Sequence, residues 1–552
     1  MPQPSDNPPL ALWAVRNQDT PIPADERRDI ANRLREVLGD YYVHLPQKVG
    51  SMAINPVREL ELLADDADAY FSSHAFFRRL LSIFTSLRDR HTTVRMPAPW
   101  NQMIAFLPFV LESCYEDQRR KLIVTKLINA PDDPHFNIGV EITHWNGVPI
   151  RTFIENFSWQ TNGSNPWARI ALALRALTLR PMAYAQPPDE DWVTLTFIDG
   201  TGAQRNATFQ WQVVIAPSAP AGGAGAQGGV AEGAAEGGAP LLGLDAGTDV
   251  INQGLQALFS RPLRARSQVL GLTAADTGLR VDELQGATQA APGIRPSILT
   301  LPSGESYGVL RIFSFHTNNI RAFVENMANI LAQMPQSGLI VDVRANPGGT
   351  IPAGEALLRL LTDKPVSFSR NTFLATPATR KLSGGAEFFH RWKRSLDMVL
   401  ETGQMFSQGF QLVEDAHWQG LEGSYTGPVV AIIDALSYST TDYFAAGFED
   451  NKIGKIIGLD PTTGAGGANV WSLDQIDRFA QAAGASPMPP LAAGVEANIA
   501  VRRALRVGDN DGLPLEGLGA RPDFLHLTTR RDIVSGNQDL LLRAVDVLKN
   551  SG

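Results

Sequence analysis

Hydrophobic positions divide the chain into a helical front, a strand-rich middle and an alternating carboxyl-terminal part. Apolar side chains recur every three or four positions over residues 24–39, and again over 57–63 and 73–85. This spacing predicts amphipathic helices, the first of which should end at Gly39. We therefore expect residues 1–100 to form a small helical domain.

Short strand-like runs replace the helical pattern from Ile104 onward. They include AFLPFVLE, KLIVTKLI and GVEITHWNGVPI, and in the last of these Asn146-Gly147 predicts a tight turn between two strands. A helical pattern returns briefly in WARIALALRALTL, and the strand patterns DWVTLTFID and ATFQWQVVI follow it. Residues 101–216 are therefore expected to form a β-rich module.

A Gly- and Ala-rich stretch follows this module. The letters PSAPAGGAGAQGGVAEGAAEGGAP fill residues 217–240 and offer little to bury. Such a composition predicts a flexible linker or long surface loop, which we place at 217–248. The next part, 249–298, has no clear periodicity, and we expect it to be an insert.

From residue 299 to residue 552, apolar strand patterns alternate with helical ones. The strand patterns are YGVLRIFSF, GLIVDVRA, GPVVAIIDA and KIIGLD, and helical patterns separate them. This alternation predicts βα units in a mainly parallel sheet, so the fold class is multidomain α/β. Because the loops that leave strand ends of such sheets carry sites, we expect the chemistry here.

Composition and charge narrow the class of protein. The chain has 552 residues, of which 44% are hydrophobic, so it can build several packed domains. No apolar run approaches the roughly 20 residues of a membrane span, and the start MPQPSDNPPLALW lacks a secretory leader, so we expect a soluble cytoplasmic protein. With 48 basic and 57 acidic residues, the net charge of −9 argues against nonspecific nucleic-acid binding. The single Cys114 allows no intrachain disulfide and is expected to be buried and inert.

A serine-rich turn is the first candidate site. In VVAIIDALSYSTTDYFAA a buried strand pattern ends near Ser437 and Ser439, and a helix begins at once. The N–H groups of a helix amino terminus favour the negative charge that develops around a nucleophilic serine and its oxyanion. The alternative interpretation is helix capping, for which Ser, Thr and Asp are the preferred residues.

A Gly-Gly turn is the second candidate. In GLIVDVRANPGG, Asp342 and Arg344 stand at the mouth of a buried strand, where we expect them to pair and, with Asn346, to brace the loop. The paired Gly348 and Gly349 can turn their N–H groups outward and bind an anion. Together the two turns would supply a serine and an anion-binding set of N–H groups, which is half of an acyl-transfer site.

The strings DVRANPGG and SYSTTDYFAAGFED resemble the carboxyl-terminal-processing (tail-specific) serine peptidase family. Residues 299–525 look like its ββα-type catalytic core, and NIGVEITHWNGVPIRTFIENF looks like a degenerate PDZ-like module. The resemblance implies that Ser439 is the nucleophile. It also implies that the N–H groups of Gly349 and Thr440 form the oxyanion hole.

One departure from the family pattern concerns the general base. Many members activate the serine with a lysine in a downstream turn, but the corresponding segment here, Pro461–Asn469, contains none. Lys452 and Lys455 flank the next strand and are expected to point to solvent. A Ser–Lys pair is therefore not expected.

A histidine from the front of the chain can take this role. The letters LRDRHTT around His91 resemble the histidine loop of the branch that includes the tricorn core and the chlamydial protease-like activity factor, which uses His and Glu. An imidazole can accept the serine proton at neutral pH and return it to the leaving group. His44 and His316 are expected to be structural.

The carboxylate that orients the histidine is expected to be Glu516. It stands in EGLGARPD, which resembles the family's ending. Glu496 is the second choice and Asp89 the third.

The function implied by the resemblance is that of a serine endopeptidase with Ser439, His91 and Glu516 as its catalytic triad. It would act on a polypeptide without a metal or cofactor, and without a nucleic-acid or membrane partner. The alternatives are an inactive carrier of hydrophobic ligands, since the scaffold also resembles the repeats of interphotoreceptor retinoid-binding protein, and an esterase or amidase. The sequence leaves open whether the chain forms a homodimer.

We predict that limited proteolysis cuts the chain first within residues 217–240, because this Gly/Ala-rich segment is expected to be exposed. Mass spectrometry of the first fragments checks the site of cleavage. Resistance of this stretch while other loops are cut would contradict an exposed linker.

Overall fold

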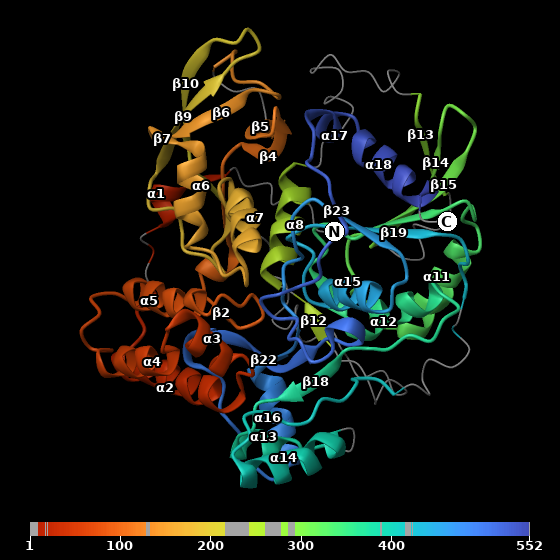
Figure 1. The fold of residues 1–552 in the computed structure, drawn as a ribbon. Coiled ribbons are helices and arrows are strands. Elements are labelled where there is room, and N and C mark those ends of the chain that lie inside the picture. The colour runs from red at the N-terminus through yellow and green to blue at the C-terminus, as the bar shows by residue number, and fades with distance from the viewer. Residues whose placement is uncertain are drawn as a thin grey trace.

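The computed structural model divides into a helical front, a β-rich module and a larger α/β part (Figure 1). Figure 1 shows the front and the β-rich module stacked on one side and the α/β part on the other. The structure describes residues 9–550 except for 17, 19, 129–132, 216–241, 245, 260–277, 285–292, 387–388, 415–420 and 422.

The front contains the three predicted helices and one that the pattern missed. The predicted ones are α2 (Ala24–Tyr41), α4 (Pro56–Asp65) and α5 (Ser73–Ser86). Gly39 lies inside α2 and does not end it, because Tyr42 and Val43 just beyond the helix are fully buried, which offsets the roughly 1 kcal/mol cost of a helical glycine. The missed helix is α3 (Leu45–Met52), whose buried side chain is the polar Lys48.

The β-rich module consists of two antiparallel sheets. One has the order β10-β9-β6-β5-β4 and the other the order β1-β11-β3-β8. The predicted turn joins β6 to β7, with positive φ angles at Asn146 and Gly147. Cys114 is buried in β4, as expected. The strands are β1 (Leu10–Ala11), β3 (Met103–Phe106), β4 (Phe109–Glu116), β5 (Arg119–Leu127), β6 (Glu141–Trp145), β7 (Val148–Pro149), β8 (Leu179–Pro181), β9 (Trp192–Ile198), β10 (Gln204–Gln210) and β11 (Gln212–Ile215), and the helices are α1 (Leu12–Val15), α6 (Ile150–Ser158) and α7 (Pro166–Ala176).

A seven-stranded sheet forms the centre of the α/β part, in the order β13-β14-β15-β16-β19-β20-β23. The pairings from β15 to β23 are parallel, so the predicted fold class is confirmed. One apolar core packs against α11, α12 and α15, and a second packs against α18. The strands are β13 (Arg280–Glu283), β14 (Ile294–Thr300), β15 (Ser306–Ile312), β16 (Leu339–Asp342), β19 (Val429–Ile433), β20 (Lys455–Gly458) and β23 (Phe524–Leu525), and the helices are α11 (Ile320–Leu331), α12 (Ile351–Leu360), α15 (Thr440–Asp450), α17 (Arg530–Val534) and α18 (Gln538–Lys549).

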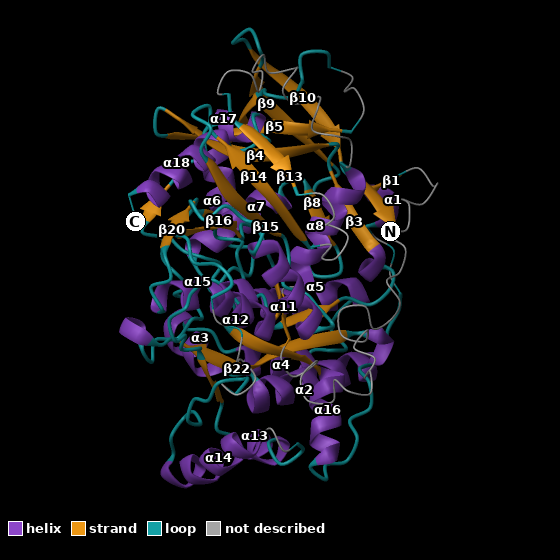
Figure 2. Cartoon of the chain, turned by 90° about the vertical axis from the view of Figure 1, so that its right-hand side faces the viewer, coloured by secondary structure: helices purple, strands orange, loops and turns teal. Residues whose placement is uncertain are grey.

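A smaller antiparallel sheet joins the front of the chain to its end. β22 (Glu496–Leu505) pairs with β2 (Thr93–Arg95), with β18 (Arg370–Phe373) and with β21 (Ala468–Ser472). The largest apolar core accordingly holds side chains from the front, the β-rich module and this sheet. Helices α13 (Pro377–Leu382), α14 (His390–Thr402) and α16 (Leu473–Ala482) lie beyond it, at the bottom of Figure 2.

The expected linker and insert are partly structured. Residues 216–241 lie outside the described residues, but β12 (Leu242–Leu244) and the start of α8 (Ala246–Leu258) correct the expectation of a linker up to residue 248. β12 forms because it finds a backbone partner: it pairs antiparallel with β17 (Gly348–Thr350), opposite the Gly-Gly turn.

Candidate active site

Ser439 lies in the turn between β19 and α15, in an unusual backbone conformation. Its φ of +64° and ψ of −120° are rare for a residue with a side chain. Such a conformation persists only where neighbouring contacts hold it, and it is common at functional sites. The side chain is fully buried.

Asp442, in the first turn of α15, holds this conformation. Its Oδ2 accepts hydrogen bonds from the N–H groups of Ser439 at 2.8 Å and Gly466 at 2.9 Å. Its Oδ1 accepts one from Ala465 N–H at 3.0 Å. Burial raises the pKa of the Asp442 carboxyl to about 6, while the donated N–H bonds lower it. The carboxyl group thus ties the serine to the segment Pro461–Asn469, which contains no lysine.

His91 meets Ser439 directly. Nε2 of His91 lies 2.7 Å from Oγ of Ser439, and the His91 side chain is buried as well. Asp89 shapes the histidine loop, because its Oδ1 accepts from His91 N–H at 2.8 Å and its Oδ2 accepts from the Thr92 hydroxyl at 3.0 Å. A serine hydroxyl and an imidazole from distant parts of the chain therefore stand within hydrogen-bond distance.

Tyr438 joins the two loops. Its ring centre lies 4.7 Å from that of His91, and the Arg90 guanidinium stands 3.9 Å from it. Arg90 N–H also donates to the Tyr438 hydroxyl at 3.2 Å. Two glycines also pack closely against the ring: a Cβ on Gly466 would lie 1.8 Å from its Cζ, and one on Gly464 2.7 Å from its Cδ2. The segment without the lysine is therefore packed against Tyr438.

The Gly-Gly turn lies beside the serine. Thr440 Oγ1 donates to the Gly349 carbonyl at 3.0 Å, which connects the start of α15 to the turn. Gly349 has a φ of +148°, and a Cβ there would lie 2.2 Å from the backbone nitrogen of His316, so only glycine fits. In this structure Gly243 of β12 pairs opposite Gly349.

Asp342 and Arg344 pair, and Arg311 joins them. The Arg344 guanidinium donates to both carboxylate oxygens of Asp342, at 2.9 and 2.7 Å, and Arg311 lies 3.4 Å away. Burial alone would raise the pKa of Asp342, but the two guanidinium groups hold it at about 2. Asn346 fixes the turn itself. Its side-chain amide donates to Ile312 O and accepts from Gly348 N–H, and its backbone carbonyl accepts from Tyr438 N–H at 3.0 Å.

The three candidate acids lie in different surroundings. Glu516 is fully buried, and its Oε1 accepts a hydrogen bond from Lys48 Nζ. Glu496 is 55% exposed at the side chain and pairs with Arg95. Because Ala500 of the same strand contacts the histidine loop through Thr92, Glu496 lies about 13 Å along β22 from that point. Asp89 lies in the histidine loop itself, where its carboxylate accepts from His91 N–H and from the Thr92 hydroxyl.

Several sequence predictions concern residues outside this cluster. Lys452 and Lys455 are exposed and pair with Asp509 and Asp523, as expected. Within the described part of the chain, no three metal-ligating side chains gather and no helix could span a membrane.

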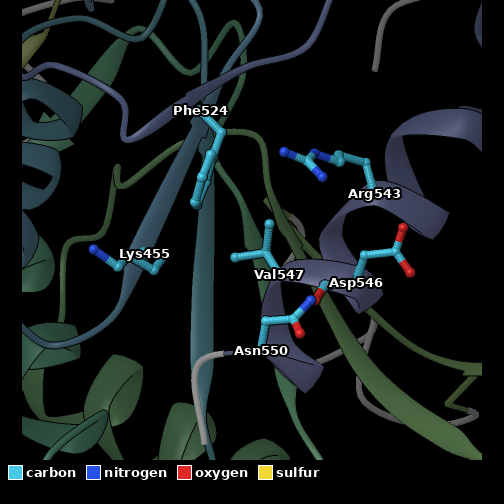
Figure 3. A pocket seen from close by; sticks show the side chains of 6 residues that line it. All are labelled: Lys455, Phe524, Arg543, Asp546, Val547 and Asn550. Atoms are coloured by element: carbon cyan, nitrogen blue, oxygen red, sulfur yellow. The ribbon is translucent and has the colours of Figure 1, made fainter.

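A hollow of about 240 Å³ lies between α18 and the strands β20 and β23 (Figure 3). Lys455 lines it at the amino end of β20, whereas Ser439 follows the carboxyl end of the neighbouring parallel strand. The hollow is therefore separate from the candidate site.

Sequence reasoning missed Lys48, Tyr438 and Asp442. Asp442 had a local signal, because an acid three residues after a serine at a helix start is typical of a capping box. Tyr438 and Lys48 had none, since their partners are distant in sequence.

A buried serine stands beside a histidine in a turn of an α/β sheet, an arrangement typical of serine hydrolases. The model of peptidase family S41 matches residues 306–477, and that of a PDZ domain matches residues 103–218. The chain thus carries an S41 peptidase domain and is a serine peptidase.

Solved structures share the whole fold. The chain is similar to mature CPAF, at 17% identity and a TM-score of 0.66, over 96% of this chain and 98% of that one. It is also similar to mature CPAF complexed with lactacystin, at 16% identity and a TM-score of 0.64, over 96% and 99%. No curated protein matches the chain.

We predict that Gly466→Ala destabilises the protein and reduces peptidase activity, because the new methyl group would overlap the Tyr438 ring. Overpacking of this kind costs about 1–3 kcal/mol. Thermal unfolding and peptide hydrolysis measure both effects. Gly200→Ala is the control, since a Cβ there has no atom within 4 Å. Equal behaviour of the two variants would contradict the described packing.

Asp442→Asn should lower both stability and kcat. An amide has one acceptor oxygen, so its nitrogen would face an N–H donor that the carboxyl group now accepts. A buried unsatisfied donor costs about 1–3 kcal/mol. Denaturant unfolding and kcat measure the loss against the exposed Asp363→Asn. Full activity in Asp442→Asn would show that this tie does not position Ser439.

Proposed function

We propose that the protein is an endopeptidase in which Ser439 and His91 perform acyl transfer. The Ser439 hydroxyl attacks the carbonyl carbon of the peptide bond while His91 Nε2 takes its proton. The C–N bond then breaks, and His91 returns the proton to the leaving amine. Water, activated by the same imidazole, hydrolyses the acyl-enzyme and restores the serine. The 2.7 Å contact between the two side chains is the observation that carries this proposal.

The N–H groups of Gly349 and Thr440 are proposed to stabilise the tetrahedral anion. Thr440 is the first residue of α15, where N–H groups point out of the helix and the dipole favours negative charge. The hydrogen bond between Thr440 Oγ1 and Gly349 O supports this role, because it holds the two residues side by side. Donors fixed in advance need no reorganisation during the reaction.

Glu516 is proposed to be the acid of the triad. Its position supports this role, because Glu516 is buried and is linked to the histidine loop through Lys48, which donates to both Arg88 O and Glu516 Oε1. Asp342, Arg344 and Asn346 are proposed to support the site by bracing the Gly-Gly turn.

The substrate class is polypeptide, as the peptidase domain implies. The ligand-carrier alternative would be favoured by a wide separation of serine and histidine, so the close contact speaks for the enzyme. A cytoplasmic location and a homodimer stay predictions from the sequence.

A fluorophosphonate probe tests the nucleophile, since it labels only an activated serine. We expect labelling of the wild-type chain and of Ser437→Ala, and no labelling of Ser439→Ala. His91→Ala should reduce kcat by about 10⁴-fold or more, as in other triads. Labelling that persists in Ser439→Ala would refute the assignment.

A further inference from the structure

A buried lysine connects the two halves of the candidate site. Lys48 lies on α3 of the helical front, and its relative exposure is 1%. Its Nζ donates to the backbone carbonyl of Arg88 at 2.9 Å and to Oε1 of Glu516 at 2.5 Å. Arg88 stands three residues before His91. One ammonium group therefore contacts both the histidine loop and the loop of the proposed acid.

We propose that Lys48 is a positioning residue that holds the carboxyl group of Glu516 and the histidine loop together. This inference rests on the proposed function, because it assigns Lys48 a role through the triad acid. It also gives the front of the chain a second contribution to the site besides His91.

The surroundings of Glu516 show why a cation is needed there. Burial raises the pKa of its carboxyl group to about 8; the Lys48 ammonium lowers this pKa, and the charge of Asp89 raises it. His44 Nε2 lies 3.9 Å from Oε2 of Glu516 but does not supply a charge, because burial lowers the pKa of His44 to about 3. Tyr42, the other titratable group facing this cluster, is buried, and its pKa is raised well above the usual value. Lys48 is thus the cation that contacts the carboxylate.

The geometry also separates Lys48 from the family's catalytic lysine. Its Nζ is engaged by Arg88 O and Glu516 Oε1, whereas the Ser439 hydroxyl faces His91 Nε2. Lys48 therefore acts through Glu516 rather than on the serine proton. Removing one partner of a buried ion pair leaves the other charge uncompensated, so the pKa of Glu516 would rise further without Lys48.

The test compares the pH dependence of kcat/KM in the wild type, in Lys48→Met and in Lys452→Met, which removes an exposed ion pair instead. In Lys48→Met the acid limb should move to higher pH by about 1–3 units, the effect of one adjacent opposite charge on a carboxyl group. Activity should recover towards the wild type at high pH, KM should change little, and Lys452→Met should match the wild type. An unshifted limb in Lys48→Met, or a loss that is uniform at all pH values, would overturn the proposal.

A second comparison covers the case in which Lys48→Met does not fold. The double variant Lys48→Met/Glu516→Gln has no buried charge to compensate. Its pH dependence of kcat/KM is measured and compared with that of Glu516→Gln alone. The acid limbs of these two variants should coincide, because the carboxyl group on which Lys48 acts has been removed from both. A further shift on adding Lys48→Met would overturn the proposal.

The same experiment separates this inference from the proposed function. Full activity in Glu516→Gln would refute both the triad acid and the role of Lys48, with Ser439 and His91 unaffected. A loss of activity in Glu516→Gln, combined with an unshifted Lys48→Met, would refute the role of Lys48 alone.

Discussion

The hydrogen bond between His91 and Ser439 is the interaction on which the site depends, and it joins residues 348 positions apart. Neither side chain could be held there by its own loop. The pairing of β2 with β22 brings the histidine loop to the carboxyl-terminal part, and the shared apolar core fixes the two parts together. Since burial removes competing water, the contact is stronger than it would be at the surface. The fold therefore serves chiefly to bring the histidine loop and the turn of Ser439 together.

The strained turn at Ser439 is stabilised by the same assembly. Asp442 accepts three backbone N–H groups around it, and Tyr438 packs between the histidine loop and Gly466. These contacts leave no room for a side chain at Gly466, where a Cβ would lie 1.8 Å from Cζ of Tyr438. Lys48 belongs to the same arrangement, since it links the histidine loop to Glu516.

Local patterns predicted the elements well, because periodicity reports which face of an element is buried. The parallel strands, helices α2, α4 and α5, and the turn before Ser439 all follow from it. Helix α3 was missed because its buried residue is a lysine, and β12 was missed because its pairing with the Gly-Gly turn is not encoded nearby. The contacts of His91 and Lys48 with the end of the chain depend on strand order, which local periodicity does not contain. Only the resemblance to a family pointed to His91.

A crystal structure with a peptide boronate tests the central claim most directly. The account predicts a covalent bond from boron to Ser439 Oγ, with one boronate oxygen held by the N–H groups of Gly349 and Thr440. It also predicts that His91 Nε2 stays within hydrogen-bond distance of the adduct. A boronate bound to another residue, or a His91 ring turned away from the adduct, would contradict the account.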